Sequence, residues 1–165
     1  MSEANFTLTK EYLHQVFEYK NGGLYWKISK QNVCAGNSLG TLGLNGYFST
    51  IIKKKPYLIH RLIFLFHYGY LPITVDHIDG NPLNNNIENL REATQSENIC
   101  NAKLYKNSTS GIKNVYFDKN ANKWVVRLSI NQKRVFLGLF ENLELADLVA
   151  HEARDLYHGK FARHS

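Results

Sequence analysis

Residues 75–98 have the sequence VDHIDGNPLNNNIENLREATQSEN and are the most informative segment of the chain. Residues 73–78 have the length and composition of a short strand, and the Gly, Pro and Asn residues after them predict a turn-rich loop. Residues 87–92 predict a second strand. Thr94 and Glu97 have the T-x-x-E spacing of a capping box, which predicts a helix running to about residue 103. The stretch therefore predicts a strand–loop–strand–helix unit.

Four polar residues of this unit can converge on one point. Asp76 and His77 end the first strand, Asn89 lies on the second, and Asn98 begins the helix. Carboxylate and amide oxygens are hard ligands that suit Mg²⁺, and a histidine can act as a general base near neutral pH. Together they could hydrolyse a phosphodiester. The alternative also stands, because Asp-His pairs are common on surfaces and Asn-rich loops are usually turns.

The charge distribution points to nucleic acid as the partner. Of the formal net charge of +6, residues 19–75 hold seven Lys or Arg and no acid, and residues 98–140 hold eight Lys or Arg against one Asp. Such basic blocks bind polyanions through counterion release, although a merely basic surface gives the same totals. Residues 76–97 form an acidic island with five acids and one base. A bound cation would explain acids between two phosphate-binding surfaces.

The flanking sequence predicts an α+β protein in two parts. Upstream, Thr9 can cap a helix with an apolar face at Leu13, Val16 and Phe17, residues 24–26 and 47–52 read as strands, and 58–68 as a helix. Downstream, residues 106–111 have linker composition. Strands are expected at 114–118, 123–130 and 134–140, with a turn at 131–132. A helix is expected at 143–157, with this inner stripe: Ala146, Val149, Ala150, Ala153, Leu156 and Tyr157.

Other features exclude several classes of protein. No apolar run approaches the length of a membrane span, and no signal peptide is evident. Cys34 and Cys100 are too few for a disulfide framework and do not have a zinc-binding spacing. The expectation is an intracellular protein without zinc.

The motif residues, read as a string, resemble the HNH homing endonucleases of phages and mobile elements. The resemblance rests on 75–82, Asn84-Asn85, 87–91, Ala93-Thr94, and Glu97-Asn98 with Asn101. Upstream it includes Gly46-Tyr47, Lys53–Lys55, His60-Arg61-Leu62, Gly69 and Pro72, so that it covers residues 7–104.

This resemblance implies a role for each motif residue. Asp76 and Asn98 would be the metal ligands, with Asn101 in reserve, and His77 the general base. Asn89 would hold the loop and orient His77 through hydrogen bonds. His60 would be structural or contact a phosphate. The cofactor would be Mg²⁺ or another divalent ion such as Mn²⁺. The zinc-stapled subtype is excluded because its cysteine pairs are missing.

The C-terminal region is similar to the APETALA/ethylene-response-factor DNA-binding domain. The similarity is carried by Gly111-Ile112, Val115-Tyr116, Lys123-Trp124, Arg127, Lys133-Arg134, Leu137-Gly138, Phe140, the helix alanines and residues 159–162. It implies a three-stranded antiparallel sheet packed on one helix, with Arg127 and Arg134 contacting DNA. Trp124 would pack either on the DNA backbone or in the core. Tyr116, Leu137 and Phe140 would be core.

These observations lead to one expected function and two alternatives. We expect an HNH nuclease with a ββα-metal centre at residues 1–105 (motif core 73–104) and a DNA-binding domain at 107–165. It would cut duplex DNA as a monomer, and could be phage-encoded and act in the host cell. The expected DNA contacts are Lys53, Lys54, Lys55, Arg61, Arg91, Lys123, Trp124, Arg127, Lys133 and Arg134. The alternatives are a non-catalytic DNA-binding regulator and an RNA-binding protein.

Overall fold

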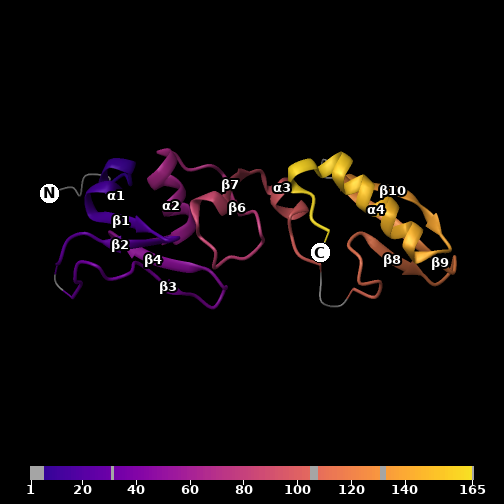
Figure 1. Ribbon diagram of the computed structural model, residues 1–165, viewed down its shortest axis with the longest axis horizontal. Coiled ribbons are helices and arrows are strands. Elements are labelled where there is room, and N and C mark those ends of the chain that lie inside the picture. Colours follow the sequence, from indigo (N-terminus) through magenta and orange to yellow (C-terminus); the bar gives the residue numbers. More distant parts are fainter. Residues whose placement is uncertain (1–5, 31, 105–107, 131–132, 165) are drawn as a thin grey trace. The chain divides into compact units, whose positions relative to one another are not determined.

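The computed structural model describes residues 6–30, 32–104, 108–130 and 133–164. The described chain is α+β (Figure 1) and forms two compact units, 1–93 and 94–165. The two units divide between residues 93 and 94, which is earlier in the chain than the predicted domain boundary at 105–107. Lys113 Nζ donates to the carbonyls of Cys100 and Ala102, both at 2.6 Å, which ties the segment after residue 94 into the second unit. The boundary at 105–107 lies outside the described residues, as do the predicted turn at 131–132 and the start of the linker at 106–107.

The described residues of the first unit form two short helices, a 3-10 turn and seven strands. In chain order they are α1 (Lys10–Val16), β1 (Phe17–Lys20), β2 (Gly23–Trp26), β3 (Thr41–Leu42), β4 (Phe48–Ile52), β5 (Lys55–Leu58), α2 (Ile59–Tyr68), β6 (Thr74–His77), η1 (Ile87–Asn89) and β7 (Leu90–Ala93). The strands form the antiparallel sheets β1-β2, β3-β4-β5 and β6-β7.

The helix α2 is the centre of this unit's core. Seven of its ten residues are buried, because α1, β2, β4, β5 and β6 all contact it. The helix ends at Gly69, which adopts a left-handed conformation with a φ of 81° and donates its N–H to the carbonyl of Leu65. Pro72 lies three residues beyond Gly69, where a helix cannot resume easily. This abrupt stop lets the chain enter β6 directly.

The start of the chain differs in one respect from the sequence prediction. Thr9 caps α1 by accepting a hydrogen bond from the N–H of Tyr12, as expected. However, α1 ends at Val16, and Phe17 begins β1 instead of extending the helical face. Phe17 is still fully buried, since its ring packs beside Trp26 of the paired strand β2. Pairing with β2 thus overrides the local helical pattern.

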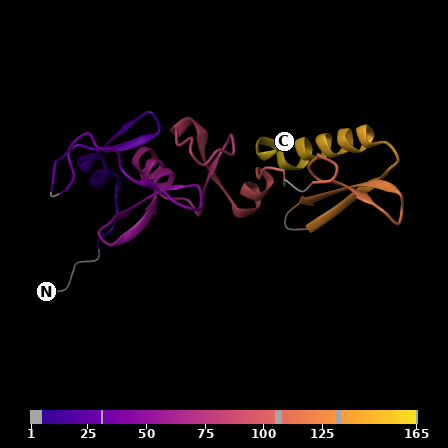
Figure 2. The same cartoon turned by 90° about the horizontal axis from the view of Figure 1, so that it is seen from below.

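The second unit is a sheet with one long helix. Its elements are α3 (Gln95–Cys100), β8 (Val115–Asp118), β9 (Lys123–Ile130), β10 (Lys133–Phe140), α4 (Leu143–His158) and η2 (Gly159–Phe161). The antiparallel sheet has the order β10-β9-β8, and α4 lies along one face of it (Figure 2). Asn142 caps α4 through its side-chain oxygen.

The inner stripe of α4 was only partly predicted. Ala146, Ala150 and Ala153 are buried, but Leu156 and Tyr157 are 74% and 52% exposed, so their assignment to the core was wrong. The last turns of the helix bury Arg154 instead, and Phe161 of η2 adds its ring to the buried set. The apolar stripe therefore ends before the helix does.

Gly40 offers a test of the packing between the three-stranded sheet and α2. Its φ is +94°, and a Cβ there would lie 2.8 Å from two side-chain carbons of Ile59. We expect Gly40→Ala to lower the free energy of unfolding of the first unit by about 2–4 kcal/mol, through backbone strain plus overpacking. Urea unfolding followed by Trp26 fluorescence in a Trp124→Phe background measures this.

Gly36→Ala is the matched control. Gly36 has a similar φ of +85°, but a Cβ there meets nothing within 4 Å. Its substitution should cost only about 1 kcal/mol. Equal losses in the two variants would contradict the close contact with Ile59.

Candidate active site

The β6–β7 pair carries Asp76 and His77 into the interior of the first unit. In its antiparallel register Asp76 lies opposite Arg91, and His77 opposite Leu90. Val75, Asp76 and His77 are all buried, with Asp76 only 4% and His77 only 5% exposed. Burying two polar side chains in succession is unfavourable unless both are hydrogen-bonded. Each therefore needs a defined partner.

Arg91 is the partner of Asp76. Its Nε donates to Oδ2 of Asp76 at 2.8 Å, across the strand pair, and both side chains are largely shielded from solvent. A charge-assisted bond in such a place is short and strong. The guanidinium of Arg91, an expected DNA contact, compensates the charge of a buried carboxylate in the structure. Contact of Arg91 with DNA stays a prediction.

Asn85 is a partner of His77. The Nε2 atom of His77 lies 2.9 Å from Oδ1 of Asn85, and Asn85 is itself only 4% exposed. An amide oxygen can only accept a hydrogen bond, so Nε2 carries the proton. In the neutral ring the basic lone pair is then on Nδ1. The arrangement therefore fixes both the orientation of the imidazole and the atom that can take up a proton.

Two aromatic side chains pack around the His77 ring. The ring centroids of His60 and His77 are 4.9 Å apart, and Tyr47 lies near both rings. Burial, together with the charges of His77 and Arg61, lowers the pKa of His60 to about 4. His60 is thus neutral at physiological pH and places no positive charge beside the His77 ring. This fits the expected structural role of His60.

The loop between the two strands is held by asparagine side chains. Oδ1 of Asn89 accepts from the N–H of Asp79 at 3.0 Å, and its Nδ2 donates to Oδ1 of Asp79 at 3.0 Å and to the carbonyl of Asn84 at 2.8 Å. Burial raises the pKa of Asp79, but hydrogen bonds from Asn84, Asn81 and Asn89 outweigh it and leave the pKa below its usual value. Asp79 thus stays ionised as the anchor of the loop.

Asn89 differs from its prediction in one way, because it lies in the 3-10 turn η1 rather than on a strand. Asn85 accepts a hydrogen bond that orients His77, and a hydrogen bond from Asn89 to His77 stays a prediction. The contacts of Asn89 in the structure hold the loop, as expected. The sequence contained no signal that separated Asn85 from Asn84 and Asn86, because all three fit an exposed turn equally well.

The predicted metal ligands belong to different units. Asp76 is in the first, whereas Asn98 is on α3 in the second, where its side chain is exposed. The capping box that opens α3 is present, with Thr94 and Glu97 bonded reciprocally, and α3 ends at Cys100, earlier than predicted. Asn101, the reserve ligand, is buried at the C-cap of α3. Joint metal binding by Asp76 and Asn98 stays a prediction.

The expected DNA contacts at Lys53, Lys54, Lys55 and Arg61 have two different environments. Lys53 and Lys54 are exposed in the turn between β4 and β5, and Lys55 is exposed at the start of β5. Lys53 and Lys54 adopt φ values of +49° and +64°, a conformation that asparagine or glycine adopts with less strain. By contrast, Arg61 is engaged in the protein, since it donates to the carbonyls of Pro72 at 2.9 Å and Ile73 at 3.1 Å. Arg61 therefore fixes the start of β6.

The sheet of the second unit has an exposed face with arginine and aromatic side chains. Arg127 pairs in register with Phe136, and Arg134 with Ser129, so both arginines lie on the same face. The Arg127 guanidinium lies 5.6 Å from the ring centroid of Tyr116 and 5.8 Å from that of Phe136. Arg127 and Arg134 are exposed. This face could contact a polyanion, and Tyr116, 37% exposed, belongs to it rather than to the core.

The other predicted residues of this sheet have different environments. Trp124 packs against the core cluster under α4 and makes an edge contact with Phe117, in line with the core alternative. Leu137 and Phe140 pack against the same cluster. Lys123 forms an exposed ion pair with Glu141 at 3.2 Å, and Lys133 is exposed at the start of β10.

Comparison with known proteins identifies the family. Residues 57–99 match the family model described as HNH endonuclease. Over 89 residues the chain is 38% identical to Protein 3.8 of Escherichia phage T7, which covers 54% of this chain and 73% of that protein. It is also 44% identical over 59 residues, 34% of each chain, to YosQ of Bacillus subtilis strain 168, whose name provisionally assigns it as an SPbeta prophage-derived HNH homing endonuclease.

The chain therefore belongs to the same family as the phage T7 protein, and its residues 57–99 form an HNH endonuclease domain. That domain points to a nuclease that acts on DNA, and HNH nucleases generally use divalent metal ions. No solved structure matches the chain. Among the described residues, no helix combines the length and apolar character that a membrane crossing requires.

The pKa of His60 predicts how stability depends on pH. Above pH 6.5 His60 is neutral in the folded and unfolded states, while between pH 6.5 and 4 only the unfolded state takes up the proton. This group should therefore lower the free energy of unfolding of the first unit by up to roughly 3 kcal/mol as the pH falls through that window.

Comparison with His60→Phe isolates this contribution. Urea unfolding of both proteins at pH 7, 5 and 4, with Trp26 as the reporter, gives the difference in stability at each pH. The wild type should lose about 3 kcal/mol relative to the variant on acidification. A difference that is independent of pH would contradict the buried neutral state of His60.

Proposed function

We propose that the protein is a Mg²⁺-dependent endonuclease of the homing type, which hydrolyses a phosphodiester bond in duplex DNA. The observation that carries the proposal is the buried hydrogen bond from His77 Nε2 to Asn85 Oδ1, with the buried carboxylate of Asp76 one residue earlier on the same strand. The bond fixes the ring and leaves Nδ1 as the atom that can accept a proton. An oriented base and a hard oxygen donor are two of the groups that phosphodiester hydrolysis requires. The name of the Bacillus relative supports the homing type.

The residues of the chain would act as follows. Nδ1 of His77 takes a proton from a water molecule, whose oxygen forms a new bond to the phosphorus. The bond between phosphorus and the 3′ oxygen breaks, and the leaving oxygen takes a proton from solvent. Asn85 holds the ring through Nε2 and stabilises the imidazolium that forms. Asp76 and Asn98 would hold the divalent ion, which when bound offsets the negative charge that develops on the phosphate.

DNA would be held by surfaces in each unit. In the first unit, the strained turn at Lys53 and Lys54, with Lys55, supplies cations close in sequence to the helix that supports the site. In the second, Arg127 and Arg134 share an exposed sheet face. Cations without fixed protein partners bind phosphates and position the duplex, whereas arginines on a sheet can reach base edges. We propose residues 107–165 as the module that selects the target, and a monomer as the active form.

Conversion of supercoiled plasmid in the presence of Mg²⁺ tests the catalytic assignment. His77→Ala should lower the cleavage rate by roughly 10²–10⁴, the contribution of a general base. Asn85→Ala should lower kcat about tenfold or more with little change in KM, because the ring loses its fixed orientation rather than its contact with DNA. Relaxed circles indicate nicking, and linear product indicates paired cuts.

Asn86→Ala is the control for Asn85→Ala. Asn86 is exposed, and its side chain bonds only within the loop, to Oδ1 of Asn84 at 3.0 Å. The Asn86→Ala variant should retain nearly the wild-type cleavage rate. Full activity of His77→Ala would refute the assigned base, and equal rates for the two asparagine variants would refute the role of Asn85. Binding without cleavage by the wild type would favour a non-catalytic DNA-binding regulator.

Duplexes selected from a random pool test the second unit. Arg127→Ala should weaken binding to the selected duplex by about 1–3 kcal/mol and relax its sequence preference. Lys119 is an exposed cation in the turn between β8 and β9. The Lys119→Ala variant should bind all duplexes more weakly to the same extent, and its binding should depend less on salt concentration. Fluorescence anisotropy at several salt concentrations separates the two effects. Unchanged selectivity in Arg127→Ala would remove this residue from base recognition.

A further inference from the structure

A stripe of acidic and histidine side chains runs along α4, outside everything assigned to the nuclease. Glu144, Asp147, His151 and Asp155 recur at intervals of three or four residues, so they share one side of the helix. Glu144, Asp147 and His151 line a hollow of about 340 Å³, together with Leu148, Arg154 and His164. The hollow therefore gathers cation-binding groups at the end of the described chain.

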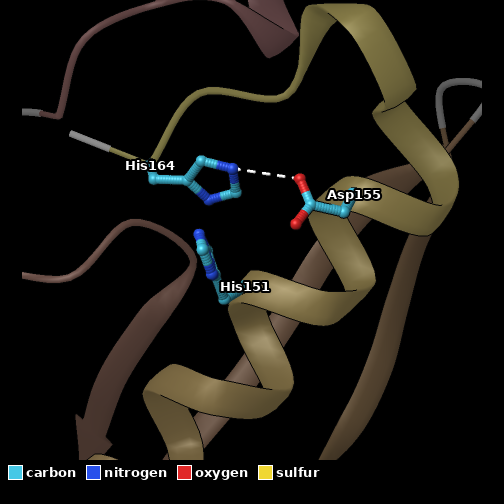
Figure 3. Close-up of side chains that lie close together, drawn as sticks. All are labelled: His151, Asp155 and His164. Atoms are coloured by element: carbon cyan, nitrogen blue, oxygen red, sulfur yellow. Dashed lines mark hydrogen bonds and ion pairs between the residues drawn. The ribbon is translucent and has the colours of Figure 1, made fainter.

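Three of these side chains converge closely. His151 and Asp155 are one helical turn apart on α4, and His164 comes back to them from the segment after η2 (Figure 3). One nitrogen or oxygen of each lies within 4.8 Å of those of the others. Nε2 of His164 is 3.0 Å from Oδ1 of Asp155, and the two imidazole ring centroids are 3.6 Å apart. Two segments of the chain thus bring three potential metal ligands together.

A buried arginine helps to fix His164 in this position. Arg154 is only 1% exposed, its Nη1 donates to the carbonyl of Lys113, and its Nε donates to Nδ1 of His164 at 3.2 Å. These bonds hold the ring of His164 where it meets His151 and Asp155.

The chemistry of the donors favours a transition-metal ion over Mg²⁺ or Ca²⁺. Imidazole nitrogens are typical ligands of Zn²⁺, whereas Mg²⁺ and Ca²⁺ select oxygen. Two imidazoles and one carboxylate make a three-ligand set that leaves a fourth tetrahedral position open. Ligand atoms around a tetrahedral Zn²⁺ lie about 3.4 Å apart, so the three exposed side chains need to close by roughly 1 Å. The lack of cysteine pairs argues only against thiolate zinc sites.

We propose that His151, Asp155 and His164 form a Zn²⁺ site that fastens the segment after η2 to α4. Coordination through Nδ1 displaces the Arg154 hydrogen bond and keeps the Nε2–H bond to Asp155, whereas coordination through Nε2 moves the ring proton to Nδ1, so that Arg154 Nε loses its acceptor in that case too. Because coordination competes with these hydrogen bonds, affinity should be in the micromolar range. The site stabilises the second unit and is separate from the metal ligands proposed for catalysis.

Calorimetric titration of the full-length, metal-free protein with ZnCl₂ tests the proposal. His151→Gln, His164→Gln and Asp155→Asn should each weaken one binding event by at least about tenfold. His158→Gln and Glu152→Gln are the matched controls, since both residues are on α4 but outside the cluster. Any binding at Asp76 is common to all variants and cancels in the comparison. Circular dichroism of the metal-free variants verifies their fold.

A second measurement identifies the ligand geometry. Co²⁺ in place of Zn²⁺ should give the visible absorption of a four-coordinate site in the wild type and both controls, and lose it in the three cluster variants. Zn²⁺ should also raise the unfolding temperature of the wild type more than that of His164→Gln. Affinity and absorption that are unchanged in His151→Gln and His164→Gln, or no saturable binding by the wild type, would overturn the proposal.

Discussion

The hydrogen bond between Nε2 of His77 and Oδ1 of Asn85 is the constraint on which the active site depends. Both side chains are almost fully buried, so neither can exchange its partner for water. Leaving one of them unpaired would cost about 1–3 kcal/mol. The loop that carries Asn85 is therefore tied to the strand that carries His77. The asparagine bonds around Asp79 shape the loop so that Asn85 turns inward while its neighbour Asn86 remains exposed.

The charges around His77 and Asp76 are also compensated or removed. Asp76 is compensated by Arg91 across the strand pair, and His60 stays neutral because burial lowers its pKa. A site built in this way holds a carboxylate and an oriented imidazole in place before any ligand arrives. Such preorganisation lowers the cost of reaching the reactive geometry. The long basic segments on either side would then attract and orient DNA without altering the site itself.

Much of the fold was predictable from sequence because local signals agreed with packing. The cap at Thr9, the stop at Gly69 and the capping box at Thr94 are each set by a few neighbouring residues. Predictions failed where distant contacts decide. Pairing with β2 draws Phe17 out of the helix, and burial of Arg154 and Phe161 replaces the expected apolar end of α4. Asn85 could not be recognised, since its role exists only once the loop closes on His77.

The tautomer of His77 tests this account most directly. Heteronuclear NMR correlations detect the two ring nitrogens of His77. Recorded at a pH where the ring carries one proton, they reveal which nitrogen holds the hydrogen. We expect hydrogen on Nε2 and a lone pair on Nδ1 in the wild type, and a mixture of the two tautomers when Asn85 is replaced by alanine. Hydrogen on Nδ1 in the wild type, or an Nε2–H form that is unchanged in the variant, would contradict it.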